Sequence, residues 1–153
     1  MQPFFADVMQ RFEDLHRDFV QAIAGVPQEG LDWVPGADMN SLCVLVVHTM
    51  GSARFWVGDM AMLEVSNRNR DAEFAARGLN EAQLKDKIIS LESYLKVAFE
   101  RLTLDDLSKP RSNQPNFPQR EFTVGWALLH ALEHTGLHVG HAQITRQLWD
   151  QRR

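Results

Sequence analysis

The spacing of apolar residues is the feature that most restricts how this chain can fold. Between residues 84 and 102, apolar side chains recur at intervals of four and three, at Leu84, Ile88, Leu91, Leu95, Ala98 and Leu102. These intervals return to one face of an α-helix, whereas a half-buried strand would alternate every second residue. The charged residues lie between these positions, so the segment predicts an amphipathic helix. Asn80, a residue type that favours helix starts, is its expected cap.

Three other segments show helical spacing. The first follows Pro3, ends before Gly25 and Pro27, and places on one face Phe5, Val8, Phe12, Leu15, Phe19 and Ile23. The second is expected to begin at a cap on Asn40 or Ser41 and to run to about Glu64. The fourth is expected to begin near Thr123 and to end near Trp149. Residues 26–39, 65–79 and 103–121 are then the connections.

A strand is the competing interpretation for residues 42–47, which are apolar on every side. The apolar pattern continues to Leu63, however, and a typical strand has only about five or six residues. We therefore predict a buried helix there, and no segment shows convincing strand alternation. Four amphipathic helices predict an all-α fold, a four-helix bundle. Residues 65–79 can span roughly 50 Å when extended, so a long crossover between the second and third helices is possible.

Length and composition predict one globular domain, residues 1–153. Hydrophobic residues make up 44% and charged residues 24%, and the formal net charge is −4. No sequence-wide basic field exists to attract nucleic acid or an anionic membrane, so neither is an expected partner. No apolar run reaches the about 20 residues of a membrane span, and no signal peptide is apparent. The lone cysteine, Cys43, has no intrachain disulfide partner, which favours a reducing, cytoplasmic location.

Histidines provide the main chemical signal. Four of the six lie in the fourth helix at intervals of four, four and three, at His130, His134, His138 and His141. They share one helix face, and two imidazoles four residues apart can bind the same metal ion. His48 lies in the apolar run of the second helix, where a buried ring needs a partner. The pattern indicates a metal site, while a hydrogen-bonded core histidine, an interface and a pH-sensitive surface remain alternatives.

Two other histidine patterns are set aside. His16 follows the apolar face of the first helix, and we predict an ordinary half-exposed residue. Residues 130–134 match the H-x-x-E-H pattern of inverted zinc peptidases, which need a further acidic ligand well downstream. Asp150 is the single carboxylate after His134, so we reject a peptidase.

The long segment 103–121 contains three prolines and is a candidate for the entrance of a site.

Two stretches resemble the DinB-like (YfiT-like) superfamily of metalloproteins. The first stretch comprises residues 33–36, 39–42 and 47–49. The second and stronger stretch is residues 129–141, where two histidines four positions apart are followed by one further residue and then a glycine. With the helix order, the resemblance covers nearly the whole chain. It implies a metal site formed by His48, His134 and His138, an up-down-down-up bundle with its crossover at residues 65–79, and frequent homodimers. His141 stands where relatives often have glutamine, so its role as a ligand or a supporting residue stays open.

The ligand set implies the cofactor and, through the resemblance, a reaction class. Three imidazoles with an open position suit zinc, and nickel, iron and manganese are also compatible. Other superfamily members are transferases or isomerases that use low-molecular-weight thiols such as bacillithiol or mycothiol. We therefore expect a metal-dependent transferase that joins such a thiol to a small electrophile. A metal-dependent hydrolase, with Glu133, Asp59 or His141 as proton carrier, and a non-catalytic metal-binding or stress-response protein are the alternatives.

Three further residues receive no site role. Cys43 lies in an apolar run where the thiolate is disfavoured, so it is expected to be an inert core residue. Arg54 and Trp56 follow His48 closely, and either can line a pocket for an anionic thiol. We interpret Arg54 as a solvated side chain and Trp56 as a core aromatic residue.

Overall fold

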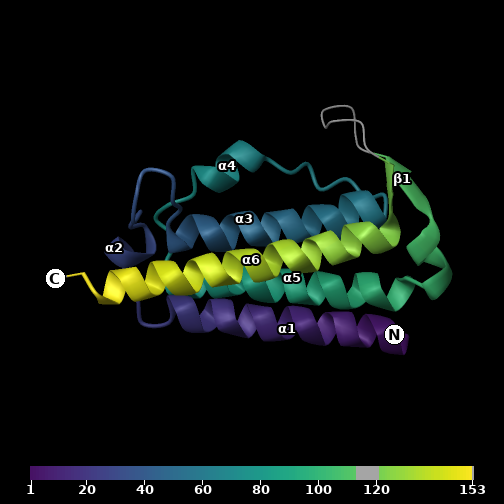
Figure 1. Cartoon of the computed structure of the whole chain (residues 1–153), viewed down its shortest axis with the longest axis horizontal. Helices are drawn as coiled ribbons and strands as arrows, with labels where there is room; N and C mark the ends of the chain where they lie inside the picture. Colours follow the sequence, from purple (N-terminus) through teal and green to yellow (C-terminus); the bar gives the residue numbers. More distant parts are fainter. Residues whose placement is uncertain (113–120, 153) are drawn as a thin grey trace.

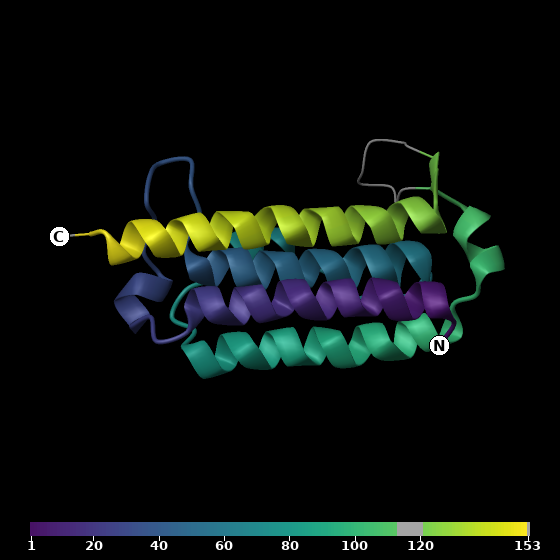
Figure 2. The ribbon, with the colours of Figure 1, turned by 60° about the horizontal axis from the view of Figure 1, so that its bottom comes forward.

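Four long helices lie side by side in a computed structural model of the chain, which describes residues 1–112 and 121–152 (Figures 1 and 2). They are α1 (Pro3–Ile23), α3 (Leu42–Arg54), α5 (Glu81–Arg101) and α6 (Val124–Asp150), and a π-helix, η1 (Phe55–Ala61), continues α3. The predicted all-α four-helix bundle is confirmed. The second predicted helix is thus α3 followed by η1, and it ends at Ala61 rather than near Glu64.

The connections contain short elements that the sequence did not predict. They are α2 (Gln28–Leu31), α4 (Arg70–Phe74), the 3-10 helix η2 (Leu104–Ser108) and the antiparallel strands β1 (Pro110–Ser112) and β2 (Glu121–Thr123). The sequence gives no sign of these strands, because three residues are too few to show alternation. Of the segment expected to form a site entrance, residues 113–120 lie outside the described residues.

The crossover places α4 on the outer side of α3. In Figure 1, α3 and α5 run in one direction while α1 and α6 run in the other, because residues 62–80 return along the bundle before α5 begins. The Gly25 amide donates to the Glu81 carboxylate at 2.9 Å, which joins the end of α1 to the start of α5. The Tyr94 hydroxyl donates to Glu64 at 2.8 Å and joins the far end of the crossover to α5. Helix α6 packs against α1 and α3, and so does α5.

Side-chain caps define the starts of three of the four long helices. The Ser41 hydroxyl accepts from the Val44 amide, Thr123 caps α6, and Asn80 forms a reciprocal capping box with Gln83. Each cap satisfies a backbone amide that has no partner inside the helix. The cap predicted at Asn80 and the helix start predicted near Thr123 are confirmed, and Ser41 rather than Asn40 caps α3. In the described part of the chain, no helix is both long and apolar enough to cross a membrane.

The core contains one buried histidine that contradicts the prediction. Every residue of the apolar stripe predicted for α5 is buried, but His16 is fully buried too, rather than half-exposed. Phe12, His16 and Phe19 continue the four-and-three spacing of α1, so His16 rather than Leu15 lies on its inner face. The His16 Nδ1 atom is 3.1 Å from a Glu92 carboxylate oxygen of α5. This partner explains how an imidazole is accommodated between two helices.

Candidate metal centre

Packing of α3 against α6 brings three predicted ligands together. One ring nitrogen from each of His48, His134 and His138 lies within 4.8 Å of the other two. The Nε2 atoms of His134 and His138 are 3.2 Å apart. Tetrahedral zinc with Zn–N bonds of about 2.0–2.1 Å needs ligand nitrogens about 3.3 Å apart. This group can therefore hold one ion with small movements of the rings.

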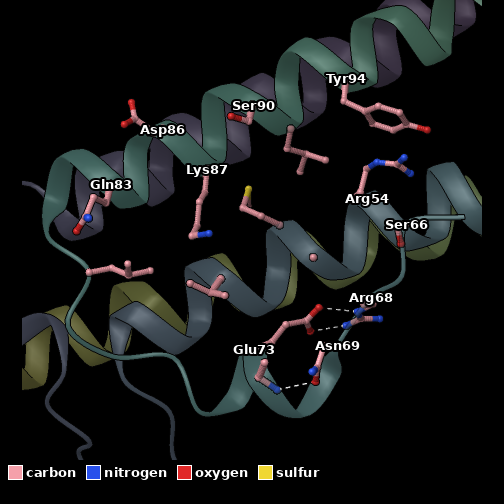
Figure 3. A pocket seen from close by; sticks show the side chains of 16 residues that line it. Arg54, Ser66, Arg68, Asn69, Glu73, Gln83, Asp86, Lys87, Ser90 and Tyr94 are labelled. Carbon is pink, nitrogen blue, oxygen red and sulfur yellow. Dashed lines mark hydrogen bonds and ion pairs between the residues drawn. The ribbon is translucent and has the colours of Figure 1, made fainter.

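Helix α4 supplies a carboxylate that orients His48. The Nδ1 atom of His48 lies 2.9 Å from Oε2 of Glu73. Glu73 also accepts two hydrogen bonds of 2.7 Å from the Arg68 guanidinium, one on each oxygen (Figure 3). Because the carboxylate is an acceptor, the proton of His48 belongs on Nδ1, which leaves the Nε2 lone pair for an ion.

Two local features allow Glu73 to reach His48. The Asn69 side chain accepts from the Ala72 amide and caps the short helix α4. Gly51 lies on α3 one turn after His48, and a Cβ atom there would collide with the Glu73 carboxylate. Sequence reasoning missed Glu73, since a five-residue helix has too few turns to show a period. The one available signal was the pairing of an Asn cap with acidic residues inside a polar crossover.

The other two ligands have different surroundings. The Nδ1 atom of His138 lies 3.3 Å from Nδ1 of the exposed His141, so Nε2 of His138 remains directed to His134. His141 thus contacts a candidate ligand and lies outside the three-histidine group. The Nδ1 atom of His134 is buried and has no hydrogen-bond partner among the described residues.

The electrostatic environment keeps the site ready to bind a cation. Burial, with smaller contributions from neighbouring histidines, lowers the pKa of His134 to about 3 and that of His138 to about 4. Both rings are neutral at pH 7, the form that has a lone pair for a metal. Burial raises the pKa of Glu73, but its bonds to Arg68 and His48 outweigh this and the pKa is lowered overall. Glu73 is therefore a carboxylate.

His130, the first histidine of the α6 face, belongs to an aromatic group. His130 stacks on Trp126 with ring centroids 4.8 Å apart and meets Trp56 edge-on at 4.6 Å. Phe122 of β2 contacts both tryptophans. The His130 ring is 5.9 Å from the His134 ring, so this group forms a wall beside the three-histidine group. Trp56 is half-buried within it.

The three candidate proton carriers lie in different places. Glu133 is exposed and lines a hollow of about 410 Å³ together with His130, His134 and Leu137. His141 contacts His138. Asp59 is instead engaged by the Ser66 amide and hydroxyl and by Arg54. Glu133 and His141 therefore adjoin the site, while Asp59 is occupied within η1 and the start of the crossover.

Two residues without an assigned role also have clear surroundings. Cys43 is buried, and burial is the main cause that raises its pKa, so it remains a thiol. Arg54 is not a freely solvated side chain, because it pairs with Glu64 at 3.0 Å and lies over the Tyr94 ring at 3.8 Å.

Replacing Glu73 by Gln is expected to weaken metal binding. Loss of the carboxylate that holds His48 removes the preference for the Nδ1–H tautomer and for one ring orientation, and such changes typically cost 10–100-fold in affinity, so about tenfold or more is expected. Competition with a metal-chelating dye measures this, with Asp71→Asn on the exposed side of the same helix as the control. Equal affinities for the two variants would show that Glu73 does not orient a ligand.

Removing the metal is expected to make stability pH-dependent between about pH 4 and 6.5. The unfolded chain binds protons on His134 and His138 near pH 6.5, whereas the folded chain resists them down to pKa values of about 3 and 4. The unfolded state therefore binds more protons in this window. The free energy of unfolding has its full value above about pH 6.5 and decreases as the pH falls through the window. Urea unfolding of metal-free protein should show a shallower pH dependence in His134→Asn than in the unmutated chain. If His134→Asn left the pH dependence of unfolding unchanged, the lowered pKa assigned to His134 would be contradicted.

Comparisons with known proteins identify the family of the chain and a related fold. The family model described as the DinB superfamily matches residues 11–142. The crystal structure of a conserved protein from Enterococcus faecalis is similar in fold, with a TM-score of 0.80 over 99% of this chain and 100% of that one. It is 15% identical in sequence, so this likeness concerns the fold alone. A search of curated proteins found no match. The family model spans most of the chain, and the protein belongs to the DinB superfamily.

Proposed function

We propose that this protein binds one divalent metal ion through His48, His134 and His138 and uses it to transfer a low-molecular-weight thiol to a small electrophile. The observation that carries the metal site is the convergence of three imidazoles around one point, with His48 oriented by Glu73. Three neutral nitrogen ligands favour zinc, and nickel, iron and manganese also accept imidazole.

The chain's own residues support a reaction in which the nucleophile comes from a second molecule. Cys43 is the single cysteine, and it is buried with a raised pKa. A divalent ion would lower the pKa of a bound thiol and so favour its thiolate form at neutral pH. The hollow beside His134 offers Glu133 and His130 as groups that can bind or move a proton.

Hydrolysis is the second candidate function, and the position of Glu133 favours it. Its carboxylate lines the same hollow as the candidate ligand His134, where it can accept a proton from water. The two reactions differ in whether a thiol is needed. A non-catalytic metal-binding or stress-response protein would need neither thiol nor electrophile.

We also propose that the protein is a homodimer formed through α6. Large apolar side chains are exposed at intervals along this helix, at Leu129, Leu137, Ile144 and Leu148. Such a stripe is typical of an interaction surface. A second copy of the same helix would cover it with apolar side chains of the same kind.

Sedimentation velocity tests the dimer. The unmutated protein should sediment with twice the mass of one chain, and Ile144→Glu should yield monomers, because a carboxylate would lose its hydration in an apolar interface. Ile89→Glu, at an exposed position of α5, is the control and should leave the dimer intact. A single-chain mass for the unmutated protein would contradict this part of the proposal.

Metal content tests the ligand assignment. Protein purified without a chelator or a histidine tag should contain about one divalent ion per chain. His48→Ala, His134→Ala and His138→Ala should each lose most of it, because an incomplete ligand shell binds weakly. His16→Ala should retain it, since His16 is paired with Glu92 between α1 and α5. Elemental analysis decides the matter, and loss in His130→Ala or His141→Ala with retention in His48→Ala would refute the assignment.

The reaction is tested by supplying both substrates. Metal-loaded protein is incubated with bacillithiol, mycothiol, glutathione or no thiol, together with a panel of small electrophiles, and conjugates are followed by mass spectrometry. Conjugate formation should require both thiol and metal and should be lost in His134→Ala. Turnover without thiol would instead indicate hydrolysis, and no turnover with any combination would favour the non-catalytic alternative.

A further inference from the structure

A second, larger cavity lies between α3, α5 and the crossover (Figure 3). Its volume is about 810 Å³, within the range of about 300–1,000 Å³ that small-molecule sites occupy. None of the three candidate metal ligands lines it. Arg68 and Glu73 do line it, so the pair that orients His48 forms part of its wall.

The base of this cavity is apolar. Val47 and Met50 come from α3, Leu91 comes from α5, and Leu79 precedes the cap of α5. Met50 and Leu91 are buried, while Val47 and Leu79 are partly buried. Apolar surface that remains partly open to a cavity of this size is a favourable contact for an apolar ligand.

Most of the charged groups in the wall are already paired. Arg68 is bound to Glu73, and Arg54 pairs with Glu64, which also accepts from the Tyr94 hydroxyl. Burial, followed by the bond to Glu64, raises the pKa of Tyr94, so this residue stays a neutral phenol. These contacts leave the wall near Arg54 and Arg68 close to neutral.

Lys87 and Asp86, which also line the cavity, are the exceptions, and both side chains are exposed. The Lys87 side chain points from α5 into the cavity, whereas the Asp86 carboxylate points in the opposite direction (Figure 3). Among the described residues, no carboxylate lies within ion-pairing distance of Lys87. Gln83 and Ser90, one turn before and one turn after it on the same face of α5, add hydrogen-bonding groups to the same wall. The cavity thus combines an apolar base with a cation that has no ion-pair partner in the described part of the chain.

We propose that this cavity is a binding site for a small organic monoanion that carries a carboxylate on an apolar body. The carboxylate lies at Lys87, with Gln83 and Ser90 able to donate hydrogen bonds to it. The apolar body lies over Val47, Met50 and Leu91. None of the candidate metal ligands lines the site, so its occupancy does not depend on the proposed reaction.

Octanoate and the uncharged octan-1-ol are matched probes for this site. Titrations of the ¹⁵N-labelled chain, followed by two-dimensional NMR, should show saturable shifts of amides around residues 47–51 and 87–94 with octanoate. Lys87→Gln should weaken octanoate binding about threefold to fivefold, as expected for an exposed ion pair, and should leave octan-1-ol binding unchanged. Lys96→Gln, on an exposed part of α5 outside the cavity, is the control and should change neither.

A cavity-filling variant provides the second test. Ser90→Trp should abolish binding of both probes, because the indole occupies the cavity, whereas Ser93→Trp on the same helix outside the cavity should not. Both titrations are repeated in His134→Ala, where binding should persist even if the metal centre is lost. The proposal is overturned by an absence of saturable shifts at the cavity residues, by equal octanoate affinity in Lys87→Gln, or by unchanged binding in Ser90→Trp.

Discussion

Burial of His48 between α3 and α6 is the constraint on which the candidate metal centre depends. A buried imidazole is costly unless its nitrogens have partners, and within the bundle Glu73 provides one at 2.9 Å. Glu73 reaches this position only because the crossover returns along α3 and folds into α4. Arg68 then balances the charge of the carboxylate, and Gly51 leaves room for it. The conformation of the crossover and the orientation of one ligand are therefore linked.

This polar cluster contributes more to the orientation of His48 than to the stability of the fold. A buried ion pair such as Arg68 and Glu73 gains Coulomb energy but loses hydration, so its net contribution to the free energy of unfolding is small. Its geometry is specific, with two parallel hydrogen bonds to one carboxylate. Across the site, the lowered pKa values of His134 and His138 show that protons bind poorly there. A metal ion that accepts the same lone pairs would satisfy these buried nitrogens and stabilise the fold.

Helix α3 and its extension separate two different environments. On the side of α6 lie the three histidines and the aromatic wall of Trp56, Trp126 and His130. On the side of α5 lies the cavity into which Lys87 points. Between them, η1 changes the helical pitch, and π-helical turns are frequent near functional sites. Arg68 and Glu73 border the cavity and contact His48, so they are the shared boundary between the two environments.

The sequence by itself determined the all-α class, the four long helices and the histidines of the candidate site, because helical spacing is local and repeats over many turns. The stripe of α5, the cap at Asn80 and the start of α6 near Thr123 are examples. The grouping of His48 with His134 and His138 came from the family resemblance, since spacing cannot relate residues of different helices. Only the tertiary structure decided the partners of these residues. Glu73 orients His48 from a five-residue helix, and His16 is buried because Glu92 faces it from α5. Such contacts depend on how segments distant in the sequence pack together, and a local sequence pattern does not specify them.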